Sequence, residues 1–430
     1  MRSGFINLSA KIMQRTFYIW KTIGIFALIL LSYTVSSQSA SQWRGADRRG
    51  IYPETGLQKS WSPGGPPMIW VNEDIGNGFG SPVFHENQIF VAGEIDSTAY
   101  LFALDLSGKI IWKTAFGKEW TQSFPGSRMS PTIYEGMIYV SSGIGNIACI
   151  EMNTGALKWM VSNNDLHVVS TMHGHSESPL VEGDIVFFTP GDKDTNVVAL
   201  DRFTGKIVWV CKGKGERSAY NSPLLLKLPE RSILVVFTAY SLLGIDTKSG
   251  ELLWVHEQVN TPAADRKLGN GDTHSNTVWF DDGSIYYIAG DGNGAVKLAL
   301  EDKGKSVREV WRNPSVDNYM GGFIIQGGKI YTCSDSRKTL LSLDAKTGVI
   351  LDSLKCGTGA VISDSRLLYY YNQKGTINLI NPEKDKLEIA GFFRIPKGTR
   401  EHFSHPVIWK GMLYIRHGKA LMAYKILSEE

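Results

Sequence analysis

The densest group of residues with metal-binding chemistry is the run His-Gly-His-Ser-Glu at residues 173–177. In an extended segment alternate side chains point the same way, so we expect His173, His175 and Glu177 to share one face. Imidazole and carboxylate groups suit Zn²⁺ or another transition-metal ion, and His274 is a candidate for a further ligand. Because no fourth ligand follows at a fixed spacing, a polar loop that leads into a strand is the alternative.

Oxygen-bearing side chains also alternate at Asp192, Asp194 and Asn196. The spacing is similar to that of a calcium-binding loop, but the glycine and the distal glutamate that such a loop needs are missing. A solvated hairpin loop explains these residues better. The chain has no nucleophile elbow, phosphate-binding loop or dinucleotide fingerprint, so the sequence assigns no catalytic residue.

A repeat must position these side chains. An apolar pair, an acidic residue, a glycine and, four residues after the glycine, a tryptophan recur along the chain. The clearest copies are Asp105 with Gly108 and Trp112, Glu151 with Gly155 and Trp159, Asp201 with Gly205 and Trp209, and Asp246 with Gly250 and Trp254. The pattern predicts a hairpin whose turn holds the acid and the glycine. We expect each tryptophan, on the returning strand, to pack between neighbouring sheets.

A second phrase, Ser-Pro or a variant of it followed by two short strands, precedes each copy and occurs eight times. The chain ends after the third strand of the eighth unit, whereas residues 67–71 supply a tryptophan-bearing strand with no unit before it. The counts predict one all-β domain over residues 38–430, an eight-bladed β-propeller of four-stranded antiparallel blades closed by its N-terminal strand. A linear solenoid is the alternative, and it would not need its first and last units to share a sheet.

The first strand of each propeller blade lines a central channel, so we expect the residues just before the eight Ser-Pro positions to form a ring. In four successive blades this place holds Arg128 with Met129 after it, Glu177, Asn221 and His274; Arg128 lies two residues before its serine and the other three lie one residue before theirs. Arg128 is a planar donor, Asn221 both donates and accepts, and Glu177 accepts or ligates a cation. The set suits an anionic or polyhydroxyl ligand in a polar funnel, with a water-filled channel mouth as the alternative.

Residues 1–37 are expected to be a signal peptide. They contain four basic residues and no acid, with an apolar run at residues 23–31 and small residues at 35–37. The run is shorter than the ~20 residues of a membrane-spanning helix. Either Met1 or Met13 can be the true start. We therefore expect an exported protein, periplasmic or secreted, with no transmembrane span after cleavage.

Composition supports a folded β protein. The chain has 430 residues, 43% hydrophobic and 20% charged, and its 45 glycines and 12 tryptophans favour short strands and tight turns. The net charge of +3 falls to −1 without residues 1–37, because 41 basic then face 42 acidic residues, which argues against a nucleic-acid partner. The cysteines form no CxxC or CxxCH motif and are expected to be buried apolar residues: Cys149, Cys211, Cys333 and Cys356.

The phrase Asp-x-x-(Ser/Thr)-Gly-(Lys/Glu)-x-x-Trp resembles the repeat of the pyrroloquinoline-quinone (PQQ) propeller family, over nearly all of residues 42–426. That family includes quinoprotein alcohol dehydrogenases and the non-enzymatic propeller subunit of the outer-membrane β-barrel assembly machine. Residues 43–50, Trp-Arg-Gly-Ala-Asp-Arg-Arg-Gly, also resemble the opening of secreted bacterial members. The resemblance implies the fold and leaves the function open, because enzymes and scaffolds share this packing motif.

The chain departs from the family's enzymes, which carry a disulfide between adjacent cysteines and hold Ca²⁺ through a Glu, an Asn and an Asp. It has no adjacent cysteines, and those ligands cannot be placed by motif. It also lacks the lipid-accepting cysteine usual in the scaffold member. We therefore expect a monomeric, non-catalytic binding or scaffold module that takes a protein, carbohydrate or small polar ligand at its funnel. The alternative is a periplasmic quinoprotein dehydrogenase that oxidises an alcohol or sugar with PQQ and Ca²⁺.

Overall fold

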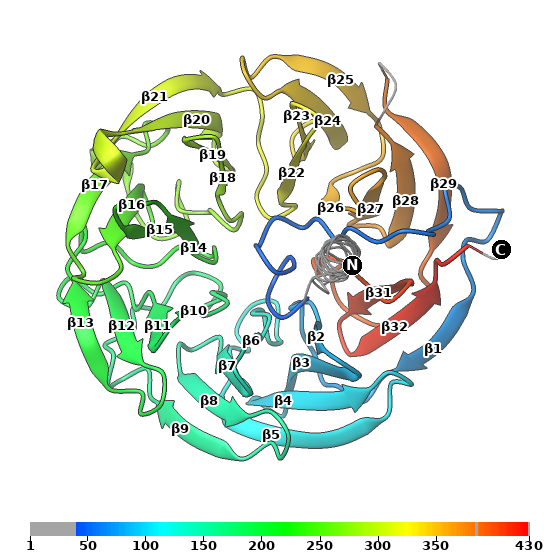
Figure 1. The fold of residues 1–430 in the computed structure, drawn as a ribbon, viewed down its shortest axis with the longest axis horizontal. Coiled ribbons are helices and arrows are strands. Elements are labelled where there is room, and N and C mark those ends of the chain that lie inside the picture. Colours follow the sequence, from blue (N-terminus) through cyan, green and yellow to red (C-terminus); the bar gives the residue numbers. More distant parts are fainter. Residues whose placement is uncertain (1–39, 383–385, 429–430) are drawn as a thin grey trace, which may run out of the picture. The chain divides into compact units, whose positions relative to one another are not determined.

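The computed structural model describes residues 40–382 and 386–428, which belong to the second of the chain's two compact units, Ser39–Glu430. These residues form eight four-stranded antiparallel sheets, arranged as blades around an axis (Figure 1). The predicted fold, an eight-bladed all-β propeller, is confirmed. The expected signal peptide, residues 1–37, lies outside the described residues.

Each blade runs from an inner strand beside the axis to an outer strand at the rim. Blades 1 to 4 are β2 (Val83–His85), β3 (Gln88–Ile95), β4 (Thr98–Asp105), β5 (Ile110–Lys118); β6 (Thr132–Tyr134), β7 (Met137–Ser141), β8 (Ile147–Glu151), β9 (Leu157–Val161); β10 (Leu180–Glu182), β11 (Ile185–Phe188), β12 (Val197–Asp201), β13 (Ile207–Cys211); and β14 (Leu224–Lys227), β15 (Ser232–Phe237), β16 (Ser241–Asp246), β17 (Leu252–Glu257). Blades 5 to 8 are β18 (Trp279–Asp281), β19 (Ser284–Ala289), β20 (Gly294–Glu301), β21 (Ser306–Asn313); β22 (Phe323–Gln326), β23 (Lys329–Ser334), β24 (Thr339–Asp344), β25 (Ile350–Leu354); β26 (Gly359–Ser363), β27 (Leu368–Asn372), β28 (Thr376–Asn381), β29 (Glu388–Arg394); and β30 (Val407–Trp409), β31 (Met412–His417), β32 (Ala420–Lys425), with β1 (Met68–Asn72) outermost.

Helix is scarce in the described ranges, which contain two short 3₁₀ helices, η1 (Ala263–Asp265) and η2 (Asp302–Gly304). Within those ranges, no helix has the length and apolar character needed to cross a membrane.

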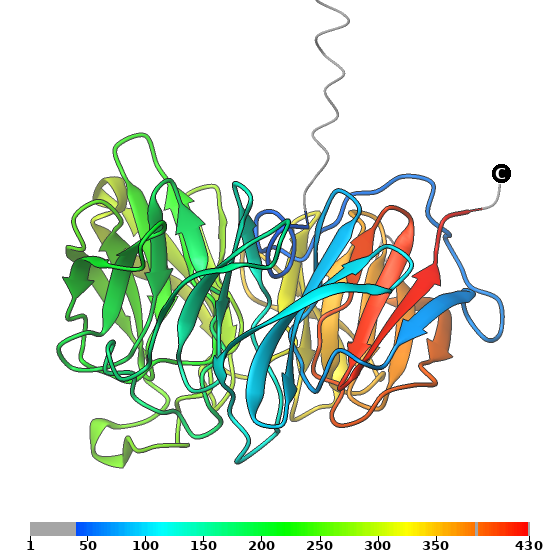
Figure 2. The same ribbon diagram turned by 90° about the horizontal axis from the view of Figure 1, so that it is seen from below.

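The two ends of the propeller sequence meet in blade 8. Strand β1 pairs antiparallel with β32, with Trp70 opposite Ala423 and Asn72 opposite Leu421. Figures 1 and 2 show β1, in blue, beside β32, in red. This pairing confirms the predicted closure by residues 67–71 and rules out an open solenoid.

The repeated tryptophans lie on outer strands and pack on the turn glycine of the next blade. A Cβ added to Gly155 would come within 2.7 Å of the Trp112 ring, and one added to Gly205 within 2.9 Å of the Trp159 ring. The indole N–H of Trp159 also donates to the carbonyl of Arg202, in the same turn as Gly205, at 2.8 Å. Since Gly205 has φ +71°, the turn needs glycine both for its backbone conformation and for the neighbouring indole.

Trp254 departs from this pattern. Its ring lies over Gly244, which faces it across its own sheet, and it packs into a core shared with blade 5. The turn of blade 5 that would receive its ring is replaced by η2. Trp254 therefore still packs between blades 4 and 5, but it does not pack on a turn glycine of blade 5.

The serines of the Ser-Pro phrases tie the inner ends of the blades together. The backbone N–H of Ser81 donates to Ser130 Oγ at 2.8 Å, Ser130 N–H to Ser178 Oγ at 2.9 Å, and Ser178 N–H to Ser222 Oγ at 3.0 Å. Each proline that follows has no N–H to satisfy. The phrase thus joins blades 1 to 4 in a chain of buried hydrogen bonds.

The cysteines take no part in covalent cross-links: all four are free thiols. Cys149, Cys211 and Cys333 are buried, as expected, and Cys356 is partly buried. The sheets are held by packing and hydrogen bonds.

Candidate ligand pocket

Residues 43–50, which we call the hub, lie on the axis of the propeller (Figure 1). The buried guanidinium of Arg48 donates to the carbonyl oxygens of Ser178 at 3.1 Å, Pro179 at 2.6 Å and Pro223 at 3.1 Å. Burial lowers the pKa of Arg48 to about 9, and the charge of nearby Glu177 opposes the shift. Neutral carbonyls of blades 3 and 4 thus anchor this arginine.

Arg44 and Arg49 anchor the hub to the other side of the ring. Arg44 donates to the carbonyl oxygens of Phe323 at 2.7 Å and Val361 at 3.0 Å, and it lies 2.8 Å from His405 Nδ1. Arg49 donates to a carbonyl of β18 in blade 5 at 2.8 Å. With Arg48, these arginines reach blades 3 to 8, which gives the Trp-Arg-Gly-Ala-Asp-Arg-Arg-Gly motif a structural role.

A pocket of about 360 Å³ lies beside the hub, where the inner strands begin. Its lining comes from the hub and from the segments that lead into the inner strands of seven blades. The lining residues are Trp43, Phe79, Phe124, Arg128, His173, Ser176, Ser178, Tyr220, Ser222, Thr273, Ser275, Tyr319, Met320, Phe403 and His405.

The lining follows a period of two counted back from each Ser-Pro position or its equivalent. The residue two before that position lines the pocket in seven blades: Phe79, Arg128, Ser176, Tyr220, Thr273, Tyr319 and Phe403. In an extended segment this residue and the serine point the same way, and the residue between them points oppositely. The signal for the pocket was therefore present in the sequence, one residue away from the position that we expected.

Of the four ring candidates, Arg128 alone lines the pocket. Glu177, Asn221 and His274 are 1%, 2% and 0% exposed, and both chain neighbours of each line the pocket instead. Backbone alternation turns these three side chains away from the pocket and into the blades. The expectation that the four would converge on one ligand is thus wrong for three of them.

The buried candidates have structural surroundings. His274 Nε2 lies 3.1 Å from the carbonyl oxygens of Ala239 and Gly271, and burial lowers the pKa of this imidazole to about 4. Burial raises the pKa of Glu177 to about 8, an effect that Thr189 and Arg48 oppose. Both groups therefore lie among blade and hub atoms rather than facing the pocket.

The expected metal cluster is not formed. His173 lines the pocket with Nδ1 3.1 Å from Ser123 Oγ, whereas His175 is buried with Nε2 3.1 Å from the carbonyl of Thr189. His175 and Glu177 share a buried face, where both contact Thr189, but His173 does not join them, because residues 172–173 form a turn rather than extended backbone. In the described part of the chain, no group of three or more His, Cys, Asp or Glu residues could hold a metal ion.

One wall of the pocket is a continuous row of rings. Ring centroids lie 5.5 Å apart for Phe79 and Phe403, 5.6 Å for Phe403 and Phe124, 5.4 Å for Phe124 and His173, and 6.0 Å for His173 and Tyr220. Such spacings are typical of favourable aromatic contacts. The rings meet at tilted or edge-on angles, so the wall presents both ring faces and ring edges.

Phe124 is held in this wall at a backbone cost. Its φ is +46°, in the left-handed region that bulky residues rarely adopt, and its side chain is 38% exposed. Arg128 holds the loop, because its guanidinium donates to the carbonyls of Ser123 at 2.5 Å, Phe124 at 2.7 Å and Gly126 at 3.1 Å. Strained residues held in place by their surroundings are frequent at binding sites.

Arg128 is a cation in a partly dry site. Burial lowers its pKa to about 10, against the raising effects of Glu119, Tyr220 and Glu401. The Glu119 carboxylate is occupied by the hydroxyl of Ser127 and by the N–H groups of Trp120 and Gly143. Arg128 therefore keeps its charge at neutral pH.

The pocket is otherwise uncharged, because burial lowers the pKa of both histidines that line it. The pKa of His173 is lowered, and the pKa of His405 falls to about 3. Opposite the row of rings the lining carries hydroxyl groups from blades 3 to 5. Within the described residues, the hydroxyls of Thr273 and Ser275 make no hydrogen bond, so they are free for a ligand.

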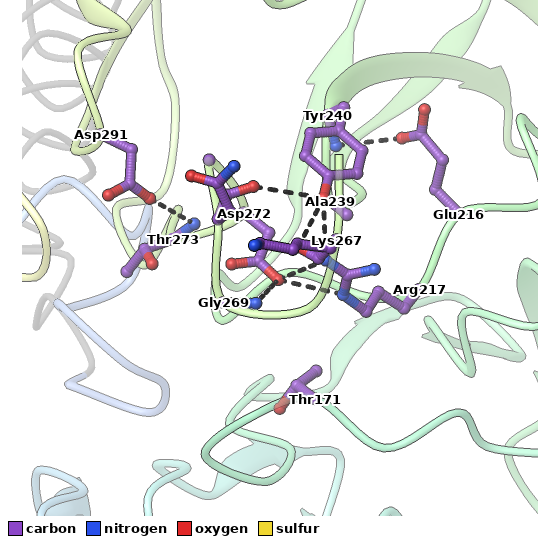
Figure 3. A network of polar contacts seen from close by, with 12 residues as sticks. Thr171, Glu216, Arg217, Ala239, Tyr240, Lys267, Gly269, Asp272, Thr273 and Asp291 are labelled. Atoms are coloured by element: carbon purple, nitrogen blue, oxygen red, sulfur yellow. Dashed lines mark hydrogen bonds and ion pairs between the residues drawn. The ribbon is translucent and has the colours of Figure 1, made fainter. Parts of the chain in front are cut away.

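A polar network fixes the hydroxyl side (Figure 3). Arg217 donates to Asp272 through Nε at 3.0 Å and through Nη2 at 2.5 Å, and the N–H of Gly269 reaches the same carboxylate at 3.0 Å. Next to Asp272, the N–H of Thr273 donates to Asp291 at 3.2 Å. The network holds the long segment between β17 and β18, and with it the free hydroxyl of Thr273.

A histidine clamp fixes the aromatic side. The two ring nitrogens of His417 lie 2.8 Å from the carbonyls of Lys397 and Arg400, and the ring stacks on His402 at 3.8 Å. These contacts bind the segment between β29 and β30, which carries Phe403, to blade 8. Hydrogen bonds outside the pocket thus fix the segments that form both of its walls.

One protein-family model matches most of the described chain. The family model described as outer membrane protein assembly factor BamB matches residues 43–172 and 101–351. The chain belongs to this family. The matched stretches include the hub and nearly all of blades 1 to 6.

The curated relatives are quinoproteins. The chain is 24% identical over 162 residues to quinoprotein alcohol dehydrogenase PedH of Pseudomonas putida, which is 35% of this chain and 25% of that protein. It is 23% identical over 214 residues to quinoprotein ethanol dehydrogenase of Pseudomonas putida, which is 49% of this chain and 26% of that protein. The matches span about a quarter of the relatives' length.

Solved structures share the fold. BamB from Moraxella catarrhalis has a TM-score of 0.62 at 12% identity and covers 84% of this chain and 99% of its own. The quinohemoprotein alcohol dehydrogenase ADHIIG from Pseudomonas putida HK5 has a TM-score of 0.60 at 13% identity and covers 91% and 81%. BamB and an alcohol dehydrogenase thus share this fold at similar TM-scores, and the fold alone does not distinguish between their functions.

The residues of the pocket do not fit the PQQ and Ca²⁺ of the enzymes. Ca²⁺ takes six to eight oxygen ligands, usually with several carboxylates, and no carboxylate lines the pocket. PQQ itself carries carboxylates, and the lining offers one cation, Arg128. The disulfide between adjacent cysteines is also impossible in this sequence.

Proposed function

We propose that this protein is a non-catalytic propeller that binds a ligand in the pocket beside its hub. The observation that supports this most strongly is the lining itself: a row of rings, free hydroxyls and one arginine, with no acidic side chain. Such a lining can hold and orient a ligand. It has no carboxylate to remove a proton from an alcohol and none to hold Ca²⁺.

We also propose that the protein acts outside the cytoplasm as a monomer and that it has a protein partner. Export follows from the expected signal peptide at residues 1–37, and the BamB family supports a role in protein assembly. Mass spectrometry of the protein purified from its cell envelope should find an N-terminus near residue 38. An uncleaved chain in the cytoplasm would contradict export.

The second candidate is a quinoprotein dehydrogenase, favoured by the names of the curated relatives. The purified protein is incubated with PQQ and Ca²⁺, and dye reduction is followed with a series of primary alcohols and sugars. The proposal predicts the same rate as in a mixture without protein. Turnover that saturates with substrate and requires both PQQ and Ca²⁺ would overturn it.

A further inference from the structure

The pocket has two unlike sides. The rings of Phe79, Phe403 and Phe124 form an apolar side that continues through His173 to Tyr220. Trp43 adds an indole near blade 8, where it lies 5.3 Å from the ring of His405. The other side presents hydroxyls of blades 3 to 5. A ligand that fills this space must be apolar along one side and hydrogen-bonding at the other.

Arg128 can only donate hydrogen bonds, whereas the hydroxyls of the lining both donate and accept them. A guanidinium has five N–H groups, and three of those in Arg128 are bound to carbonyls of its own loop, which leaves two for a ligand. Thr273 and Ser275 add free hydroxyls. The lining has no carboxylate or amide side chain, which leaves its hydroxyls as the side-chain oxygens that could accept the several O–H groups of a sugar.

Charge selects in the same direction. The lining carries one cation and no acid, and Arg128 takes part in none of the ion pairs among the described residues. Glu119 and Glu401 are its nearest carboxylates, and neither lines the pocket. An anionic group beside the free N–H groups of Arg128 would gain charge-assisted hydrogen bonds.

Size limits the ligand. Small-molecule sites are usually 300–1,000 Å³, so a pocket of about 360 Å³ is at the small end. We propose that the pocket binds an aromatic monocarboxylate of one or two rings, with its ring against Phe124 and Phe403 and its carboxylate at Arg128. This inference rests on the proposed function and names the ligand class of that site.

The test is a calorimetric titration of the purified protein with 2-naphthoate, 2-naphthamide, glucose, and PQQ with and without Ca²⁺. We expect saturable binding of 2-naphthoate and at least about tenfold weaker binding of the uncharged amide, because the charge-assisted bonds to Arg128 are lost. Arg128→Gln and Phe403→Ala should each weaken 2-naphthoate by about tenfold or more. The matched controls Arg308→Gln and Phe392→Ala change exposed residues of outer strands and should leave binding unchanged.

The other outcomes separate the two claims. No saturable binding of 2-naphthoate, equal binding of acid and amide, or a preference for glucose would overturn the ligand class and leave a binding propeller. Tight PQQ binding that requires Ca²⁺ would overturn the proposed function as well. Arg128 also holds its loop, so Arg128→Lys is used as a second variant that keeps the positive charge. Circular dichroism and the melting temperature verify that each variant is folded.

Discussion

Replacement of Arg48 by methionine should destabilise the whole propeller. The variant keeps a long unbranched side chain on the axis but removes the donor from the carbonyls of Ser178, Pro179 and Pro223. A buried acceptor that loses its partner costs about 1–3 kcal/mol. Part of this cost is offset, because the variant no longer buries a charge. The carbonyl of Pro179 keeps the hydroxyl of Thr132 as a donor at 2.6 Å, so two acceptors lose their partner. We therefore expect a net loss of about 2–4 kcal/mol, toward the lower end of the sum for two acceptors.

The loss translates into a measurable temperature shift. Unfolding entropy of about 2.1 cal/mol/K per residue, over a unit of about 390 residues, gives about 0.8 kcal/mol/K. The melting temperature of Arg48→Met should fall by about 3–5 °C in differential scanning calorimetry. The matched control, Arg308→Met, removes an exposed ion pair with Glu301 and should shift it by about 1 °C or less. Equal shifts in the two variants would refute the structural role of the hub.

Three further predictions concern the blades and the walls of the pocket. Gly205→Ala should lower stability by more than Gly183→Ala, by about 2 kcal/mol or more, because both have positive φ but the new methyl group meets the Trp159 ring at Gly205 alone; equal losses in urea melts would contradict the indole packing. Glu177→Gln should become more stable relative to the wild type as the pH rises from 5 to 8.5. The carboxyl pKa is raised in the folded state to about 8, so its contribution is complete below about pH 4.5 and is lost through pH 8; a constant difference between the melting curves would argue against it. His417→Ala should speed hydrogen–deuterium exchange at least about tenfold in the segment before β30, since both of its carbonyl contacts are lost; unchanged exchange there would show that the clamp holds nothing.

The propeller could be predicted from the sequence because the residues of its repeat are the residues that pack one blade on the next. The turn glycine and the tryptophan that packs on it come from neighbouring blades, as with Gly205 and Trp159. Each copy of the repeat therefore indicates that another blade packs beside it. Strand counting placed β1 beside β32 for the same reason, since an outer strand without a unit must complete another sheet. Such features depend on local chain geometry and on repetition, and both can be read from one sequence.

The site was harder to predict, because a shift of one residue along an extended segment moves a side chain to the opposite face. The candidates Glu177 and His274 were one residue away from the lining positions Ser176 and Thr273. The hub could not be placed at all, because the partners of Arg48 are backbone carbonyls that leave no trace in residue type. Aromatic residues seldom suggest chemistry in a sequence, which is why the wall around Phe124 was missed.

We propose that the pocket beside the hub binds a ligand without Ca²⁺-dependent quinone chemistry. An equilibrium titration of the purified protein with PQQ, followed by absorbance, with Ca²⁺ present and with Ca²⁺ removed by chelator, tests this proposal. The lining around Arg128 predicts that Ca²⁺ does not strengthen PQQ binding. Tight PQQ binding that appears when Ca²⁺ is added, and that Arg128→Gln abolishes, would contradict the account.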